Sequence, residues 1–330
     1  MHHIGSTTSL PNEIANPFPI KKPSKPRQQS TLVRLLRAAY HSVCPTPSAS
    51  KFKFESTPEA ATYNSRILEE ANFDLANVLA TEPSSCCQPT AELRHSSVLF
   101  PLFDLSPTTA DKLKEMMTSG ISYPIEDPYP ERQDDVEAAM QEENNASTRG
   151  SEEFISKALD KEVGRGWQIP ILPDIIPKLV GAGRIKLGVA KRIFIDMFGE
   201  LFTKSRVTHD CSQPQQSGKS VNLMCVKEKL QATRYGKAFY RYLLNLYNAR
   251  HHHPNIPILQ AKFDMDSAYR RCFVNLQYAL LCCTIFLSFG YILLRLPFGS
   301  SPAAGEFSVL TDFIADIANK LYQDLSWDPY

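Results

Sequence analysis

Hydrophobic positions recur at helical spacing through the first half of the chain. Between Pro58 and Leu79 apolar residues fall three or four positions apart, and Thr57 precedes a proline in the first turn, which is typical of a capped helix. The residues before it are rich in Pro, Ser and Lys around one apolar stretch, Leu32 to Tyr40, which predicts disorder with one transient helix. Further helices are predicted from Ser106 to Met117 with Gly120 after it, from Asp134 to Met140, and from Ser151 to Val163.

The hydrophobic pattern changes after residue 167. The stretch QIPILPDIIPKLV holds three prolines, which exclude a regular helix or a central strand and favour an extended connector. Beyond it we expect a basic helix at Val226 to Asn248 and short strands at Ile185 to Val189, Ile193 to Met197, Arg206 to His209 and Ile258 to Met265. The chain is therefore predicted to be α+β, with a disordered segment (residues 1–57), a mainly helical leader region (58–184) and a mixed region (185–330).

One apolar run raises the question of a membrane. Tyr278 to Leu294 holds 17 residues without a charge, whereas a spanning helix needs about 20 apolar residues. The run contains the turn signal Ser288-Phe289-Gly290, so two antiparallel strands joined near Ser288 to Gly290 are favoured over a membrane helix. No signal peptide is visible, and eight cysteines lack CxxC spacing, which favours reduced thiols in an intracellular protein of the cytoplasm or nucleus.

Charge is balanced over the whole chain but not along it. The net charge is +1, yet residues 191–250 hold 11 Lys and Arg against 4 Asp and Glu, while residues 126–153 hold 10 acids against 2 arginines. The first segment could meet a polyanion, and the second is an acidic, solvated segment. Two other polar stretches are interpreted as surface loops: QQSGKSVN lacks the first glycine of a phosphate-binding loop, and HHHP lacks a metal-site spacing.

The stretch AKFDMDSAYRRC offers the strongest candidate chemistry. On a strand, Asp264 and Asp266 point to the same face, and paired carboxylates suit Mg²⁺. Taken alone, the two acids favour an edge strand with two solvated carboxylates over a Mg²⁺ site. Arg270 and Arg271 are either phosphate contacts or charges on a helix surface.

Three segments in order change that balance: KSRVTHDCSQPQQSGKSVN from Lys204, DMDSAY from Asp264, and LRLPFGSSPAAGEF from Leu294. Together they resemble retrotransposon reverse transcriptases, whose fingers carry a Lys-x-Arg-x-x-x-Asp segment ending in Asn. The palm of that family carries Asp-x-x-x-Ala-Tyr/Phe and then a Pro-Phe-Gly motif. The resemblance covers residues 186–316 and implies an RNA-directed DNA polymerase, a nucleotidyltransferase, with right-hand fingers and a partial palm.

The resemblance assigns roles to five residues around the metal and the phosphates. Arg206, with Lys204 beside it, would contact the triphosphate of an incoming nucleotide. Asp264 would be the first metal-binding and catalytic acid, with the carbonyl of Met265 next to it. Asp266 lies at the second, more variable acid position. The implied cofactor is Mg²⁺, and the implied partners are a nucleic acid (RNA template or DNA) and a deoxynucleoside triphosphate.

The resemblance extends to the sugar and to the fingers segment. Tyr269 would lie under the sugar and exclude the 2′-hydroxyl, while Phe298 and Gly299 would lie against the nucleotide and template. Asp210 and Asn222 fall at the positions that continue and close the fingers segment. Upstream, Arg132 to Asp135 followed by a Trp and several prolines resembles the leader of algal retroelement polyproteins.

One motif of the family is missing. An aromatic-x-Asp-Asp hairpin should follow the Pro-Phe-Gly motif, but the Asp-Asp pair of this chain is Asp134-Asp135, far upstream. Because each Mg²⁺ needs more ligands than Asp264 and a carbonyl supply, we expect a truncated reverse transcriptase without catalysis. The alternative is a non-enzymatic helical protein that binds nucleic acid or another partner. The residues expected to bind nucleic acid are Lys227, Lys229, Arg234, Lys237 and Arg241.

Overall fold

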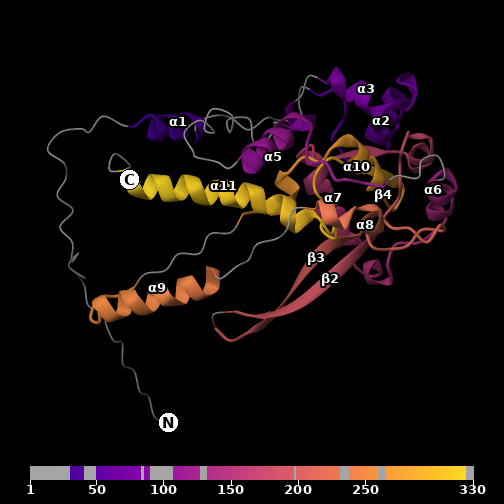
Figure 1. The fold of residues 1–330 in the computed structure, drawn as a ribbon. Helices are drawn as coiled ribbons and strands as arrows, with labels where there is room; N and C mark the ends of the chain where they lie inside the picture. Colours follow the sequence, from indigo (N-terminus) through magenta and orange to yellow (C-terminus); the bar gives the residue numbers. More distant parts are fainter. Residues whose placement is uncertain are drawn as a thin grey trace, which may run out of the picture.

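A computed structural model describes residues 30–40, 50–82, 85–89, 107–126, 132–196, 198–230, 238–258 and 265–324. The fold is α+β, with helices around small antiparallel sheets (Figure 1). The α-helices are α1 (Thr31–Tyr40), α2 (Pro58–Glu70), α3 (Leu75–Ala80), α5 (Pro107–Thr118), α6 (Arg132–Met140), α7 (Glu152–Gly164), α8 (Val221–Met224), α9 (Ala238–His252), α10 (Leu276–Leu281) and α11 (Ala303–Gln323). The strands are β1 (Gln168–Ile171), β2 (Lys186–Ile195), β3 (Leu201–Asp210), β4 (Thr284–Phe286) and β5 (Phe289–Leu293).

A three-stranded sheet of order β1-β5-β4 lies at the centre of the core. Both pairings are antiparallel, with Gln168 opposite Leu293 and Thr284 opposite Tyr291. All four residues of β1 are buried, and buried Asn64 of α2 donates a hydrogen bond of 2.8 Å to the Pro170 carbonyl. This side-chain bond joins α2 to the edge of the sheet.

Strand β1 corrects the prediction of an extended connector. The first residues of QIPILPDIIPKLV form a buried strand, and Pro173–Lys178 forms a 3-10 helix. Pro170 is tolerated in β1 because this strand lies at the edge of the sheet and pairs only with β5. The N–H that proline lacks is therefore not needed for pairing on a second side. The prolines thus exclude a central strand, as predicted, but allow an edge strand.

The apolar run of residues 278–294 is part helix and part hairpin. The predicted antiparallel hairpin is confirmed as β4 and β5, with Leu287 and Ser288 in the turn. The prediction is wrong for the first residues, because Asn275 caps the short helix α10, which runs to Leu281. Among the described residues, no helix is long and apolar enough to cross a membrane.

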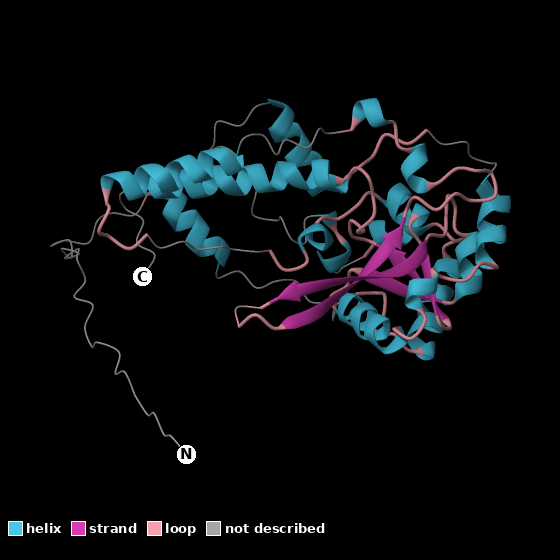
Figure 2. Cartoon of the chain, turned by 90° about the horizontal axis from the view of Figure 1, so that it is seen from below, coloured by secondary structure: helices cyan, strands magenta, loops and turns pink. Residues whose placement is uncertain are grey.

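Strands β2 and β3 form a separate two-stranded ribbon that projects from the body of the molecule (Figures 1 and 2). Ten residues of each strand are paired, from Lys186 opposite Asp210 to Ile195 opposite Leu201. The prediction of short separate strands is therefore too cautious, because β2 runs unbroken through Lys191. The base of the ribbon is buried and its tip is exposed.

The helix predicted from Pro58 to Leu79 is two helices. Thr57 caps α2 as predicted, accepting a hydrogen bond from the Ala60 N–H at 3.2 Å. The chain then turns at Asn72 and Phe73, which both have a positive φ, and Asp74 caps α3. Helices α5, α6 and α7 confirm the other helical predictions in this half.

Several predictions fall wholly or partly outside the described residues. The strand predicted from Ile258 to Met265 cannot be compared over residues 259–264, and its two end residues are not in a strand. The basic helix predicted from Val226 has a 3-10 turn at Lys227–Lys229, then residues 231–237 outside the described part, then α9. Helix α1 coincides with the helix expected in the N-terminal segment, while residues 1–29 lie outside.

Candidate functional site

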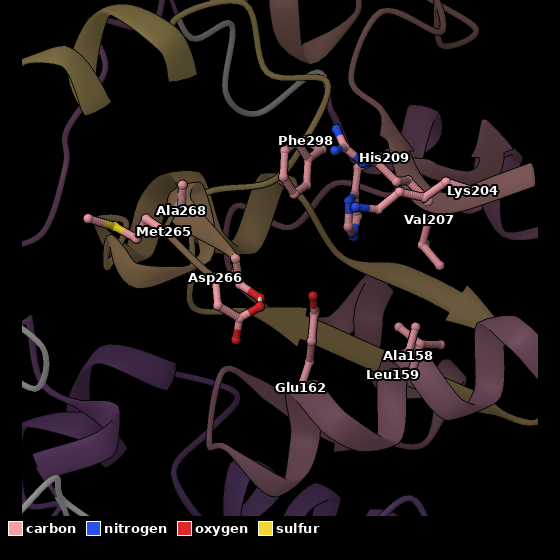
Figure 3. A pocket seen from close by; sticks show the side chains of 12 residues that line it. Ala158, Leu159, Glu162, Lys204, Val207, His209, Met265, Asp266, Ala268 and Phe298 are labelled. Atoms are coloured by element: carbon pink, nitrogen blue, oxygen red, sulfur yellow. Dashed lines mark hydrogen bonds between the residues drawn. The ribbon is translucent and has the colours of Figure 1, made fainter. Parts of the chain in front are cut away.

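A cavity of about 390 Å³ opens between α7, β3, the segment before Tyr269 and the loop before α11 (Figure 3). Its volume lies within the range of ligand sites in proteins, about 300–1,000 Å³. Its lining residues are Ala158, Leu159, Glu162, Lys204, Arg206, Val207, His209, Met265, Asp266, Ser267, Ala268 and Phe298.

The cavity brings together residues that the sequence predicted from three separate segments. Lys204 and Arg206 come from β3, Met265 and Asp266 from the acidic stretch, and Phe298 from the Pro-Phe-Gly motif. Asp264, the predicted catalytic acid, lies outside the described residues.

Strand β3 places its two cations on one face of the ribbon. Side chains alternate along a strand, so Lys204 and Arg206 share a face, opposite Arg192 and Ala190 of β2. Both cations are exposed, and among the described residues neither has an acidic partner. Their charge is therefore available to an anionic ligand.

Glu162, in the wall of the cavity, forms an ion pair with a buried arginine. Arg270 is 1 % exposed, donates from Nε to the Glu162 carboxylate at 3.0 Å, and donates from Nη1 to the Arg295 carbonyl at 2.9 Å. Gln168 also donates to Glu162. Burial has the largest single effect and raises the pKa of Glu162, but the charge and hydrogen bonds of Arg270, with smaller effects of His209 and Gln168, together lower it by more. The net pKa is therefore lowered and the carboxylate is ionised. Arg270 is thus neither a phosphate contact nor a surface charge.

His209 lies beside this ion pair and is neutral. Burial, reinforced by the charge of Arg270, lowers the pKa of His209 to about 3, and Glu162 offsets this only in part. Its backbone N–H donates to the Phe298 carbonyl at 3.0 Å. The bond joins β3 to the loop that carries the Pro-Phe-Gly motif.

Asp266 is exposed and already matched by positive charge. Its carboxylate lies 3.3 Å from Arg165 and 3.9 Å from Arg271, and Ser267 donates to it at 3.0 Å. The hydrogen bond from Ser267, together with the hydrogen bond and charge of Arg165 and the charge of Lys161, lowers the pKa of Asp266 despite the opposing effect of desolvation. The carboxylate is ionised but shared with arginines.

The described residues do not by themselves fit Mg²⁺. Within the described ranges, no group of three or more His, Cys, Asp or Glu side chains could hold a metal ion. The two carboxylates of the cavity, Glu162 and Asp266, are each engaged by arginine. A magnesium site therefore stays a prediction that depends on Asp264.

Asn222 joins the segment from Lys204 to Asn222 to the Pro-Phe-Gly motif. Asn222 donates to the Gly299 carbonyl at 2.9 Å and accepts from the Ser301 N–H at 2.8 Å. Gly299 has φ of +110°, and a Cβ there would lie 1.9 Å from the His209 carbonyl oxygen. The segment that ends at Asn222 and the Pro-Phe-Gly motif, which the resemblance assigns to one family, are therefore in direct contact.

Tyr269 supports the cavity and does not line it. Its ring centroid lies 5.1 Å from that of Phe298 and 5.3 Å from that of Phe307 in α11. The predicted contact between Tyr269 and a sugar remains a prediction.

The described residues among those predicted to bind nucleic acid do not line the cavity. Lys227 and Lys229 are exposed in a 3-10 turn, Arg241 is exposed on α9, and Arg234 and Lys237 fall outside the described residues. Around Arg241, α9 exposes large apolar and aromatic side chains: Phe239, Tyr240, Tyr242, Leu243, Leu244 and Tyr247.

The sequence did not single out two residues of the site, Glu162 and His209. In the sequence, Glu162 is one of several acids on a predicted helix, and His209 is the residue before Asp210. No local pattern marks either one, because their burial is created by segments far away in the chain.

Comparisons of the chain with known protein families, curated proteins and solved structures find no match. The chemistry of the cavity therefore rests on its own residues.

Proposed function

We propose that the cavity binds the triphosphate of a nucleotide, and that residues 185–330 are the fingers and partial palm of a polymerase of the reverse transcriptase class. The observation that carries the proposal is the convergence of Lys204, Arg206, Asp266 and Phe298 on one cavity. These residues come from motifs that are far apart in sequence, and the resemblance assigns all of them to one nucleotide site.

The charge distribution supports an anionic ligand. Two other cations near the cavity are paired within the protein: Arg270 pairs with Glu162, and Arg165 with Asp266. Lys204 and Arg206 have no such partner among the described residues, and charge-assisted bonds to phosphate are among the strongest in proteins.

The same ribbon face continues away from the cavity and could follow a nucleic acid. Arg192 lies opposite Lys204, and the rings of Phe194 and Phe202 stack at 5.7 Å toward the tip. Cations beside exposed aromatic rings suit phosphates and bases of a single strand. The partners of the proposal are thus a deoxynucleoside triphosphate and an RNA or DNA strand.

A binding measurement tests the proposal. The double variant Lys204→Ala/Arg206→Ala should weaken binding of a fluorescent deoxynucleoside triphosphate by about tenfold or more, because each charge-assisted bond is worth about 1.5–3 kcal/mol. Lys191→Ala is the matched control, since Lys191 is exposed on the opposite face of the same ribbon. Equal losses in the two variants, or no binding by the unmodified chain, would contradict the proposal.

A second candidate function is nucleic-acid binding without nucleotide chemistry. It is favoured by α9, where exposed tyrosines surround Arg241. In that case oligonucleotide binding would depend on α9 and be insensitive to the cavity variants.

A further inference from the structure

His209 is a buried polar side chain that the protein leaves unsatisfied at the edge of the cavity. It is 4 % exposed, and among the described residues neither ring nitrogen has a hydrogen-bond partner. Buried side-chain nitrogens nearly always have a partner, because water that solvates them in the unfolded chain is lost on folding. An imidazole that lines a cavity and has no hydrogen-bond partner at either nitrogen therefore indicates a ligand.

The nearest polar groups are already in use. The Glu162 carboxylate accepts from Arg270 and Gln168, and Asp266 is engaged by Arg165 and Ser267. In Figure 3 the side chains of Glu162, Asp266, His209 and Phe298 surround the same space. His209 lines that space, and its ring nitrogens have no existing hydrogen bond among the described residues that a ligand would have to displace.

The chemistry of this end of the cavity differs from that of the cationic end. The imidazole is neutral, since burial and Arg270 hold the pKa of His209 near 3, so one nitrogen donates and the other accepts. The ionised carboxylates of Glu162 and Asp266 lie nearby and repel phosphate. An uncharged group with both a donor and an acceptor, such as a sugar hydroxyl or a base edge, fits here.

We propose that His209 binds the nucleoside part of the ligand while Lys204 and Arg206 bind its phosphates. This inference rests on the proposed nucleotide function and extends it, because it makes His209 a residue that distinguishes a nucleotide from a bare polyphosphate. Phe298, which lines the same space, would offer its ring to the nucleoside.

The test compares two probes, a deoxynucleoside triphosphate and inorganic tripolyphosphate, by calorimetry in buffer with a metal chelator. The unmodified chain should bind the nucleotide about tenfold more tightly than tripolyphosphate, since a good hydrogen-bonded pair is worth about one factor of ten. His209→Leu should remove this preference and leave tripolyphosphate binding unchanged. His209→Asn keeps a neutral donor and acceptor and should retain part of the preference, while Arg206→Ala should weaken both probes alike.

A spectroscopic readout needs no variant. The ring nitrogen resonances of His209 should shift when the nucleotide is added and stay in place with tripolyphosphate. This measurement remains decisive if His209→Leu fails to fold.

Each outcome bears on one proposal or both. Equal affinity for the two probes, with fixed His209 resonances, would overturn the role of His209 and leave phosphate binding by the cations standing. If neither probe binds the unmodified chain, both proposals fail. A His209→Leu variant that is more stable than the unmodified chain, with its nucleotide preference intact, would show a core histidine with no ligand role.

Discussion

Gly299 is the residue where the backbone of the site is most constrained. Its φ of +110° suits glycine, and a Cβ would meet the His209 carbonyl oxygen at 1.9 Å. Gly299→Ala should therefore lower the free energy of unfolding by about 3 kcal/mol or more, as measured by urea unfolding. Gly199→Ala is the control, because Gly199 has a φ of +86° with open space around it and should cost only about 1–2 kcal/mol. If the two variants lose similar amounts of unfolding free energy, the close approach of Gly299 to the His209 carbonyl is not what excludes a side chain at residue 299.

Arg270 is the residue whose loss should depend most on pH. Arg270→Met leaves the mostly buried Glu162 carboxylate without its cation, which should cost about 3–5 kcal/mol at pH 7. The folded pKa of Glu162 is lowered, so the pair stabilises the fold above the unfolded pKa of about 4.3 and this contribution is lost as pH falls through the folded pKa. In the variant the carboxyl becomes protonated in acid, so the difference from the unmodified chain should shrink below about pH 4.

Chemical denaturation at pH 7 and pH 3.5 measures this difference. Arg271→Met is the matched control. Arg271, the next residue in the chain after Arg270, pairs at 3.9 Å with the exposed Asp266, so its loss should cost about 1 kcal/mol or less. A cost for Arg270→Met that is the same at both pH values would argue against an ionised Glu162.

Helix α9 is the element whose surface is least explained by packing. Its exposed tyrosines could stack on bases, at about 1–3 kcal/mol each, so Tyr240→Ala and Tyr247→Ala should weaken binding of a single-stranded oligonucleotide. Arg241→Ala should make the slope of log affinity against log salt shallower by about 0.7, the value for one phosphate on a single strand. Fluorescence anisotropy at two or more salt concentrations measures both effects.

The control for α9 is a lysine that is already neutralised. Lys157→Ala removes an exposed cation on α7 that lies 2.6 Å from Glu153, and should leave the slope unchanged. Binding that is independent of salt, or equal effects of Arg241→Ala and Lys157→Ala, would count against α9 as a nucleic-acid surface.

At the scale of the whole molecule, the set of acids limits the chemistry. The 330 residues contain no aromatic-x-Asp-Asp, and Glu162 and Asp266 are held by arginines. We therefore expect the chain to give no template-directed nucleotide incorporation with Mg²⁺ or Mn²⁺ in a primer-extension assay. Extension that is lost in Asp264→Ala would contradict this and would mean that another acid completes the site.

The sequence by itself determined the features that depend on neighbouring residues. Thr57 and the turn near Ser288 are local signals, and the N-cap of α2 and the β4–β5 hairpin follow from them. The α+β class was also predicted, because the hydrophobic periods of helices and strands can be read along the chain. The grouping of Lys204, Arg206, Asp266 and Phe298 was implied by the resemblance of three ordered motifs to one family. Asp264 and the magnesium site stay predictions.

Only the tertiary structure decided which side chains are buried and paired. Arg270 and Glu162 are 108 residues apart in sequence, yet they form the ion pair that takes Arg270 out of reach of a ligand. His209 is buried where β3 contacts the loop at Phe298. Residues 168–171 form the strand β1 because they pair with β5. Desolvation and partner choice depend on contacts between distant segments, and no local pattern of residues encodes them.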